Sequence, residues 1–198
     1  MDFKDFDELN SLAKTFLEKR FAEDIRQNKK PEDDDELMDL VLSLLLEWYD
    51  RGITDACVDV DWGYSKRVAD EDDSIKERVI YENIAGMNFE DRVREYAKDY
   101  DVAGIMLVIT TECHRVYNAA IQHVAELYED DNGVSIGKKW FTMEDEKVRD
   151  THSYLHGKSV GRDDYFYTFD NDAARFPGDF ADPANNCNCR CWIKLEKI

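Results

Sequence analysis

The sequence lacks a long apolar run and the short motifs of several common enzyme classes. Its longest apolar run, Val102 to Ile109, is far too short to span a bilayer, so no membrane association is expected. The charged opening residues do not resemble a secretory signal peptide. The segment from Gly133 to Gly137 has no Lys-Ser/Thr pair, which a phosphate-binding loop needs, and no nucleophile elbow occurs elsewhere.

Basic side chains are also scarce. The chain has 26 Lys and Arg against 45 Asp and Glu, which gives a formal net charge of -19. Such a surface repels a phosphate backbone at long range, so direct binding to bare nucleic acid is doubtful. The charge suits docking on a basic partner surface. It also permits an acidic decoy that imitates DNA, provided that the acids form stripes on one face.

The five cysteines are an odd number, and they do not form a regular framework. Cys57 and Cys113 lie far in sequence from the other three. This pattern indicates a reducing compartment rather than a disulfide-stabilised secreted protein. With 198 residues, 43% of them hydrophobic, the chain can bury a core of one large domain or two small ones.

The first two thirds of the chain shows helical periodicity. Apolar residues recur at intervals of three and four between Phe3 and Phe21, which predicts a helix that ends near Gln27. A second helix is predicted to begin at Pro31, because acidic residues in a first turn complement the helix dipole. Gly52 is expected to end this second helix.

A long helix is predicted from Asp101 to about Asp130. Its polar residues Glu112, Arg115 and Asn118 need partners if they are buried, so they are expected to face the C-terminal part of the chain. The inward side of the helix is expected to carry Ile105, Val108, Ile109, Val116, Ala120, Val124 and Leu127.

The C-terminal third has short segments separated by Gly, Asp, Asn and Pro. A strand is predicted from Lys138 to Thr142, and Thr142 is expected to cap a short helix from Met143 to about Leu155. Further short strands are predicted at residues 158–160, 165–169 and 189–195.

The change of pattern near residue 133 predicts the organisation of the chain. We expect an α+β protein, with an N-terminal and central helical arm over residues 1–132 and a small mixed α/β unit over residues 133–198. The arm is expected to dock on a partner.

Three side chains of the predicted short helix, Asp145, Arg149 and His152, share one face because of their spacing. Two interpretations stay open. The three can belong to a catalytic cluster with Glu112, in a small enzyme of the nuclease or transferase type that works by general acid–base chemistry. They can equally form a lock of ion pairs and hydrogen bonds that fixes the helix against the strands.

The cysteines Cys187, Cys189 and Cys191 alternate along the sequence. In an extended strand their thiols point to one face and lie about 7 Å apart per step, too far for one zinc ion unless the chain bends. If it bends, His152 or His156 can complete the zinc ligands. The alternative is that the thiols are free and pack as small apolar side chains.

An ordered set of residues runs through this third of the chain: Lys139, Trp140, Thr142, Asp145, Arg149, His152, Leu155, Gly157, Pro177-Gly178-Asp179 and Asn188-Cys189-Arg190-Cys191. The set resembles the C-terminal domain of phage head morphogenesis proteins, the phage Mu protein F-like minor head proteins. A weaker similarity extends upstream through residues 89–93 and 111–118. The chain departs from the family pattern in having Cys187 and His156.

The resemblance implies a non-enzymatic minor capsid protein that acts in head morphogenesis. Such a protein associates with the portal and with capsid or scaffold components, and aids DNA packaging or delivery. It is expected in the virion, and in the host cytoplasm during assembly. The residues expected to gather into one compact structural knot are Trp140, Asp145, Arg149, His152, Gly157, Asn188 and Arg190.

Overall fold

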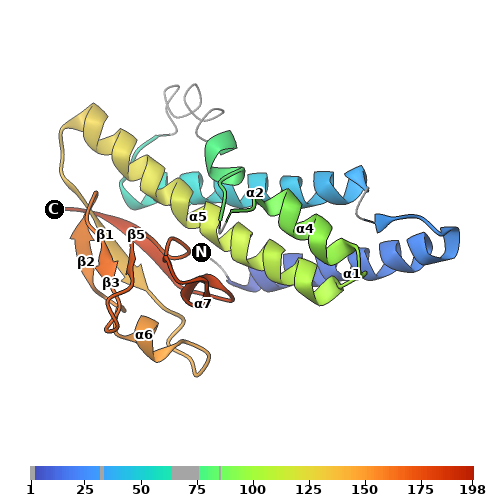
Figure 1. Ribbon diagram of the computed structural model, residues 1–198. Coiled ribbons are helices and arrows are strands. Elements are labelled where there is room, and N and C mark those ends of the chain that lie inside the picture. The colour runs from blue at the N-terminus through green and yellow to red at the C-terminus, as the bar shows by residue number, and fades with distance from the viewer. Residues whose placement is uncertain (1–2, 32–33, 64–75, 85) are drawn as a thin grey trace.

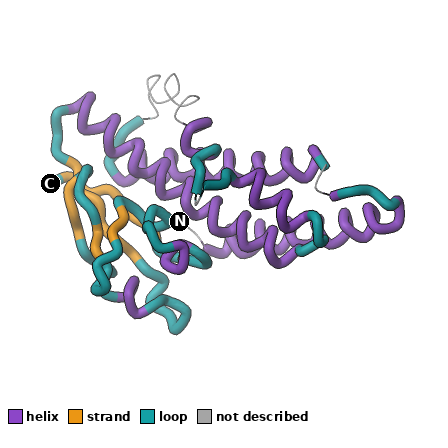
Figure 2. The backbone as a smooth tube through the Cα atoms, in the orientation of Figure 1, coloured by secondary structure: helices purple, strands orange, loops and turns teal. Residues whose placement is uncertain are grey.

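The structure is a computed structural model that describes residues 3–31, 34–63, 76–84 and 86–198, without the side chains of residues 3–6. The Phe3 end of the predicted apolar stripe and the acids at positions 32 and 33 therefore lie outside the described side chains. The long helices occupy one side of the molecule, and the strands lie on the other side together with the short C-terminal helices (Figures 1 and 2).

The element order confirms the α+β class. The helices are α1 (Phe3–Gln27), α2 (Asp35–Asp59), α4 (Phe89–Ala97), α5 (Val102–Asn132), α6 (Asp150–Ser153) and α7 (Pro183–Asn186), with a further helical turn at residues 76–80. The strands are β1 (Ile136–Phe141), β2 (Ser159–Gly161), β3 (Phe166–Tyr167), β4 (Ala173–Ala174) and β5 (Trp192–Lys197). Among the described residues, no helix is both long and apolar enough to cross a membrane.

Helix α1 ends at Gln27 as predicted, but the predicted limits of α2 were wrong. The helix begins after Asp34, whose carboxylate accepts hydrogen bonds from the backbone N–H groups of Glu36 and Leu37. It continues through Gly52 to Asp59. Gly52 lies where α2 meets α5, because an added Cβ would sit 2.3 Å from the carbonyl oxygen of Tyr117. The glycine permits close helix packing and does not end the helix.

The long helix α5 runs through the centre of the molecule and leads into β1 (Figure 1). It begins at the predicted cap, Asp101, whose side chain accepts from the N–H of Gly104 at 2.9 Å. It ends at Gly133, which adopts φ 62° and donates its N–H to Glu129 O. The inward residues predicted for this helix are all buried, and so are several polar ones, because other elements pack around it.

The sheet is antiparallel with strand order β2-β1-β5, and β3 pairs with β4 separately. Trp140 of β1 pairs with Ile193 of β5, and both are fully buried. Strand β5 is an edge strand whose N–H groups are satisfied by helix side chains. Ile193 N–H donates to Asn118 of α5 and Leu195 N–H donates to Asp59 of α2, each at 3.1 Å. These bonds hold the sheet against both helices.

The predicted helix from Met143 to Leu155 was wrong, because only α6 is helical in this segment and Arg149 is its N-cap residue. Glu144 adopts φ 54°, and its N–H donates to the Thr142 hydroxyl. Asp145 accepts from Lys147 N–H at 3.0 Å. Such local bonds between side chain and backbone compete with helix formation.

Candidate functional site

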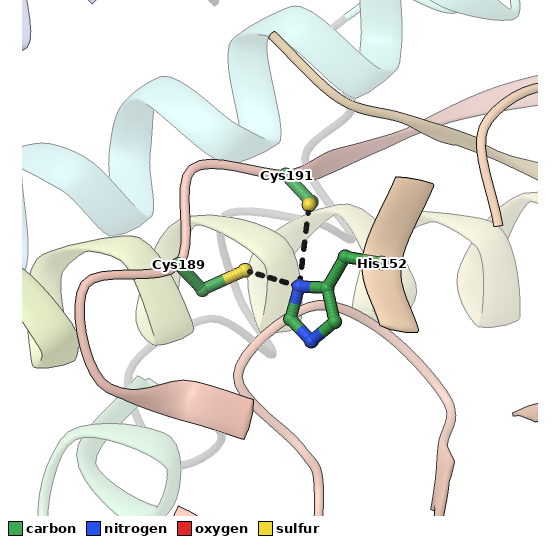
Figure 3. Close-up of side chains that lie close together, drawn as sticks. All are labelled: His152, Cys189 and Cys191. Atoms are coloured by element: carbon green, nitrogen blue, oxygen red, sulfur yellow. Dashed lines mark hydrogen bonds between the residues drawn. The ribbon is translucent and has the colours of Figure 1, made fainter. Parts of the chain in front are cut away.

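The chemical centre of the C-terminal part is a buried cluster of one imidazole and two thiols. His152 lies on α6, whereas Cys189 and Cys191 lie between α7 and β5. Both sulfur atoms point to Nδ1 of His152, at 3.4 Å for Cys189 and 3.5 Å for Cys191 (Figure 3). The three residues are only 1%, 5% and 2% exposed. Segments almost 40 residues apart thus meet at one imidazole nitrogen.

Of the two cases considered for the three cysteines, an extended strand or a bent chain, the structure has the bend, and the strand predicted from Cys189 begins only at Trp192. Cys187 is the C-cap residue of α7, and Asn188 adopts φ 53°, so the chain turns before it reaches β5. The turn brings Cys189 and Cys191 to one point. Cys187 lies outside this group of close ligand atoms, and so does His156, whose Nδ1 lies 3.0 Å from the Thr142 hydroxyl.

Aromatic rings surround the imidazole. The ring of Phe180 stacks on that of His152 with centroids 5.2 Å apart, and Trp140 meets it edge-on at 6.0 Å. Among the described residues, the buried Nε2 atom of His152 has no hydrogen-bond partner. The surroundings are therefore apolar, and charges within them interact strongly.

The two thiols differ in acidity. Burial on its own raises the pKa of Cys189, but hydrogen bonds from Cys191 and His152 outweigh it, and that pKa lies well below its usual value. The pKa of Cys191 is raised by its hydrogen bond to Cys189 and by burial. Cys189 therefore loses its proton more easily than Cys191 does.

Sequence reasoning did not single out His114 of α5. Its Nε2 atom contacts the carbonyl oxygen of Cys191, and the side chain is 1% exposed. Burial lowers the pKa of His114, so the ring is neutral. The available signal was the i, i+4 spacing from His114 to Asn118, because Asn118 holds β5 at the same face of the helix.

The predicted trio does not converge. The Arg149 guanidinium donates to the carbonyl oxygen of Cys187. Asp145 pairs with Arg190 at 2.5 Å near the surface, and the Arg190 hydrogen bond lowers the pKa of Asp145. His152 alone points into the buried cluster. Each member of the trio thus contacts the segment 187–191 at a different point.

Glu112 does not join the trio, and the prediction that it faces the C-terminal part was wrong. Its buried carboxylate pairs with Arg92 of α4 and with Arg115, each at 2.9 Å. Arg115 also pairs with Glu82 at 2.8 Å. This network joins α4 and residues 79–82 to α5. Of the predicted polar residues, Asn118 does bond to β5, and the backbone of Arg115 packs against Gly178.

The remaining residues of the expected knot lie in the same region. Gly157 adopts φ 76° and donates its N–H to the carbonyl oxygen of Trp140 at 2.8 Å, which closes the loop that carries His152. Asn188 makes the turn before Cys189, and Arg190 holds Asp145. Contacts of Arg149 and Asp145 thus connect the loop after β1 with the segment 187–191, and the role of the seven residues as one structural knot stays a prediction.

The comparison with known families agrees with this geometry. The family model described as phage Mu protein F like protein matches residues 73–194, which is more than half of the chain. The matched range includes the C-terminal pattern as well as α4 and α5. No curated protein and no solved structure matches the chain. The protein therefore belongs to the phage Mu protein F like family, a family of phage head morphogenesis proteins.

Proposed function

We propose that the protein is a minor head protein that associates with the portal during head assembly and aids DNA packaging or delivery. The family match over residues 73–194 carries this proposal, because it covers both the long helix and the C-terminal loops. The protein acts in the host cytoplasm during assembly and remains in the virion. Its partners are the portal and capsid or scaffold components.

The net charge of -19 supports docking on a basic protein surface and opposes contact with packaged DNA. In a DNA-filled head, repulsion from the genome keeps such a protein on its protein partner. The docking part is the helical arm. Its first helix exposes two apolar side chains one turn apart, Leu12 at 65% and Phe16 at 39%. An exposed apolar pair is suited to a partner with an apolar site, and the negative charge of the chain as a whole suits a basic surface around that site.

The test is co-purification of the protein with the portal protein of the same phage after co-expression. Deleting residues 1–50 would remove Leu37, Leu45 and Trp48, which belong to the core, and would therefore unfold the protein. A double substitution, Leu12→Asp with Phe16→Asp, changes only exposed positions. It is expected to reduce portal binding at least tenfold, with an unchanged circular dichroism spectrum.

The matched control is Val58→Asp, which places the same carboxylate at an exposed apolar position of α2. This variant is expected to bind the portal like the wild type. Equal binding by the double variant would contradict docking through α1. Failure of the wild-type protein to bind portal at all, with capsid and scaffold components present, would overturn the portal association itself.

A further inference from the structure

We propose that His152, Cys189 and Cys191 bind a zinc ion. The ion would cross-link the segment that contains α6 to the segment between α7 and β5. The ligand atoms are Nδ1 of His152 and the two Sγ atoms, which all lie within 4.8 Å of one another. A mixed set of imidazole and thiolate ligands is typical of zinc sites. The set differs from the sequence-based expectation, since Cys187 is not a member.

The distances between ligand atoms fit a tetrahedral ion. Zinc lies about 2.3 Å from thiolate sulfur and about 2.0 Å from imidazole nitrogen, so a tetrahedral angle places sulfur and nitrogen about 3.6 Å apart. The observed distances from His152 Nδ1 are 3.4 Å to Cys189 and 3.5 Å to Cys191. An ion can therefore be accommodated with little movement of the three side chains.

Two sulfurs lie close to one imidazole nitrogen, and the Cys191 thiol also hydrogen-bonds to Cys189. A neutral imidazole nitrogen has a single in-plane lone pair, or a single proton, and so makes one good hydrogen bond. Both Cys189 and Cys191 nevertheless aim at Nδ1 from different directions (Figure 3). A shared cation between the three atoms accounts for this convergence.

Charges and protons balance when zinc binds. The two thiols lose their protons to solvent, the neutral imidazole donates its Nδ1 lone pair, and the zinc site is electrically neutral. Within the described part of the chain, the cluster of close ligand atoms contains these three residues and no other. The cluster therefore supplies three of the four ligands that zinc usually takes.

An ion here would hold a part of the fold that has little regular structure. The described strands outside β1 and β5 have two or three residues, and α6 and α7 have four each. Loops of this kind lose much conformational entropy when they fold. Small loop-rich units commonly recover that loss by binding a structural metal.

The test is metal analysis of the full chain, purified under reducing conditions without chelators and then equilibrated with zinc and desalted. We expect one zinc per chain in the wild type and loss of it in Cys189→Ser, Cys191→Ser and His152→Ala. A chelator is expected to lower the Tm of the wild type. Replacement of zinc by Co²⁺ is expected to give the charge-transfer bands of thiolate ligands, which report the ligands independently of stability.

Cys187→Ser is the matched control, because it removes a thiol from the same short segment and is expected to retain one zinc. Loss of zinc from this variant would overturn the three-ligand set. A metal-free wild type after equilibration, a Cys189–Cys191 disulfide found in the reduced preparation, or iron in place of zinc would overturn the proposal. Where a variant fails to fold, the Co²⁺ spectrum of the wild type decides, since absence of thiolate bands contradicts the site.

Discussion

Asn118 shows how one side chain connects the helices to the sheet. Its amide nitrogen donates to His114 O at 2.9 Å, and its Oδ1 accepts from Ile193 N–H at 3.1 Å. The residue is fully buried, so neither group has water as a substitute. The position of β5, and with it of Cys191, depends on this contact.

We predict that Asn118→Ala lowers the free energy of unfolding by about 2–4 kcal/mol, because the buried Ile193 N–H loses its acceptor and a small cavity forms. Chemical denaturation of both proteins measures the difference. Asn132→Ala is the matched control, since Asn132 makes the same bond to a carbonyl four residues earlier, Tyr128 O, in the last turn of the same helix. Its effect is expected within about 0.5 kcal/mol. Equal effects would contradict the role given to Ile193.

Lys138 gives a prediction for pH. Its ammonium is buried and donates to the carbonyl oxygens of Asp164 and Arg175 at 3.1 and 3.0 Å. Burial, and then the charge of Arg175, lowers its pKa from 10.5 to about 8. Between these values the unfolded chain binds more protons at this site than the folded one, so this group makes stability rise with pH.

We therefore predict that the stability of the wild type relative to Lys138→Met rises between pH 8 and 10 by roughly 1 kcal/mol per pH unit. Below pH 7 the difference is expected to be constant, because Lys138 is charged in both states. Other titrating groups cancel in the comparison. Lys139→Met, at the half-buried neighbouring position, is the matched control for removing a lysine from β1. A constant difference for Lys138→Met up to pH 10 would disprove the lowered pKa.

At the residue scale, the sequence identified the cluster residues but not their contacts. His152, Cys189 and Cys191 were recognisable as candidate ligands from residue type alone. The left-handed turn at Asn188, which brings the thiols together, was not, because asparagine tolerates this conformation but adopts it at only some of its positions in the chain. His114 was missed because its partner is a backbone carbonyl, which every residue possesses.

At the element scale, Gly52 is the point of closest approach between α2 and α5. An added Cβ would lie 2.3 Å from Tyr117 O and 2.8 Å from the Cβ of Ala120. Both are rigid parts of the neighbouring helix, so the helices must separate. The free energy lost when the helices separate exceeds the gain of about 1 kcal/mol in helix propensity that alanine has over glycine in a helix interior.

We predict that Gly52→Ala lowers the free energy of unfolding by about 2–3 kcal/mol, as expected for overpacking of a tight contact. Thermal and chemical unfolding measure it. Gly63→Ala is the control, because among the described residues no atom beyond its chain neighbours lies within 4 Å of its added Cβ, and it is expected to be nearly neutral. A stabilised Gly52→Ala protein would show that the helices can separate without cost.

The limits of the elements were predictable where they depend on nearby residues. Asp101 and the periodic apolar residues of α5 are local signals, and the structure agrees with them. Gly52 was misinterpreted because a glycine that ends a helix and one that packs against another helix look alike in sequence. The helix predicted from Met143 does not form, because the side chains of Thr142 and Asp145 accept hydrogen bonds from nearby backbone N–H groups. Such bonds compete with the backbone hydrogen bonds of a helix.

At the scale of the whole molecule, α5 is shared by the helices and the sheet. One continuous cluster of buried apolar residues extends from Ala13 in α1 to Leu195 in β5. Asn118 and Asp59 add hydrogen bonds between the helices and β5. If the sheet unfolds, α5 exposes one apolar side and leaves polar groups without partners. The helical arm and the C-terminal unit are thus expected to depend on each other for stability.

We predict that the protein unfolds in one cooperative transition. The first measurement is helix content, followed by far-ultraviolet circular dichroism. The second is the fluorescence of a variant that retains only Trp140, which is fully buried in β1, while the other three tryptophans become phenylalanine. Both are expected to give the same midpoint in urea. The converse variant, which retains Trp48 of α2, is the control and reports the helical side. Hydrogen exchange of β5 and α2 is expected to show similar protection. Separate midpoints for Trp140 and Trp48 would mean that the C-terminal unit opens alone. In that case the contacts of α5 with β5 are too weak to couple the two parts, and the loops around His152 can rearrange while the helices stay folded.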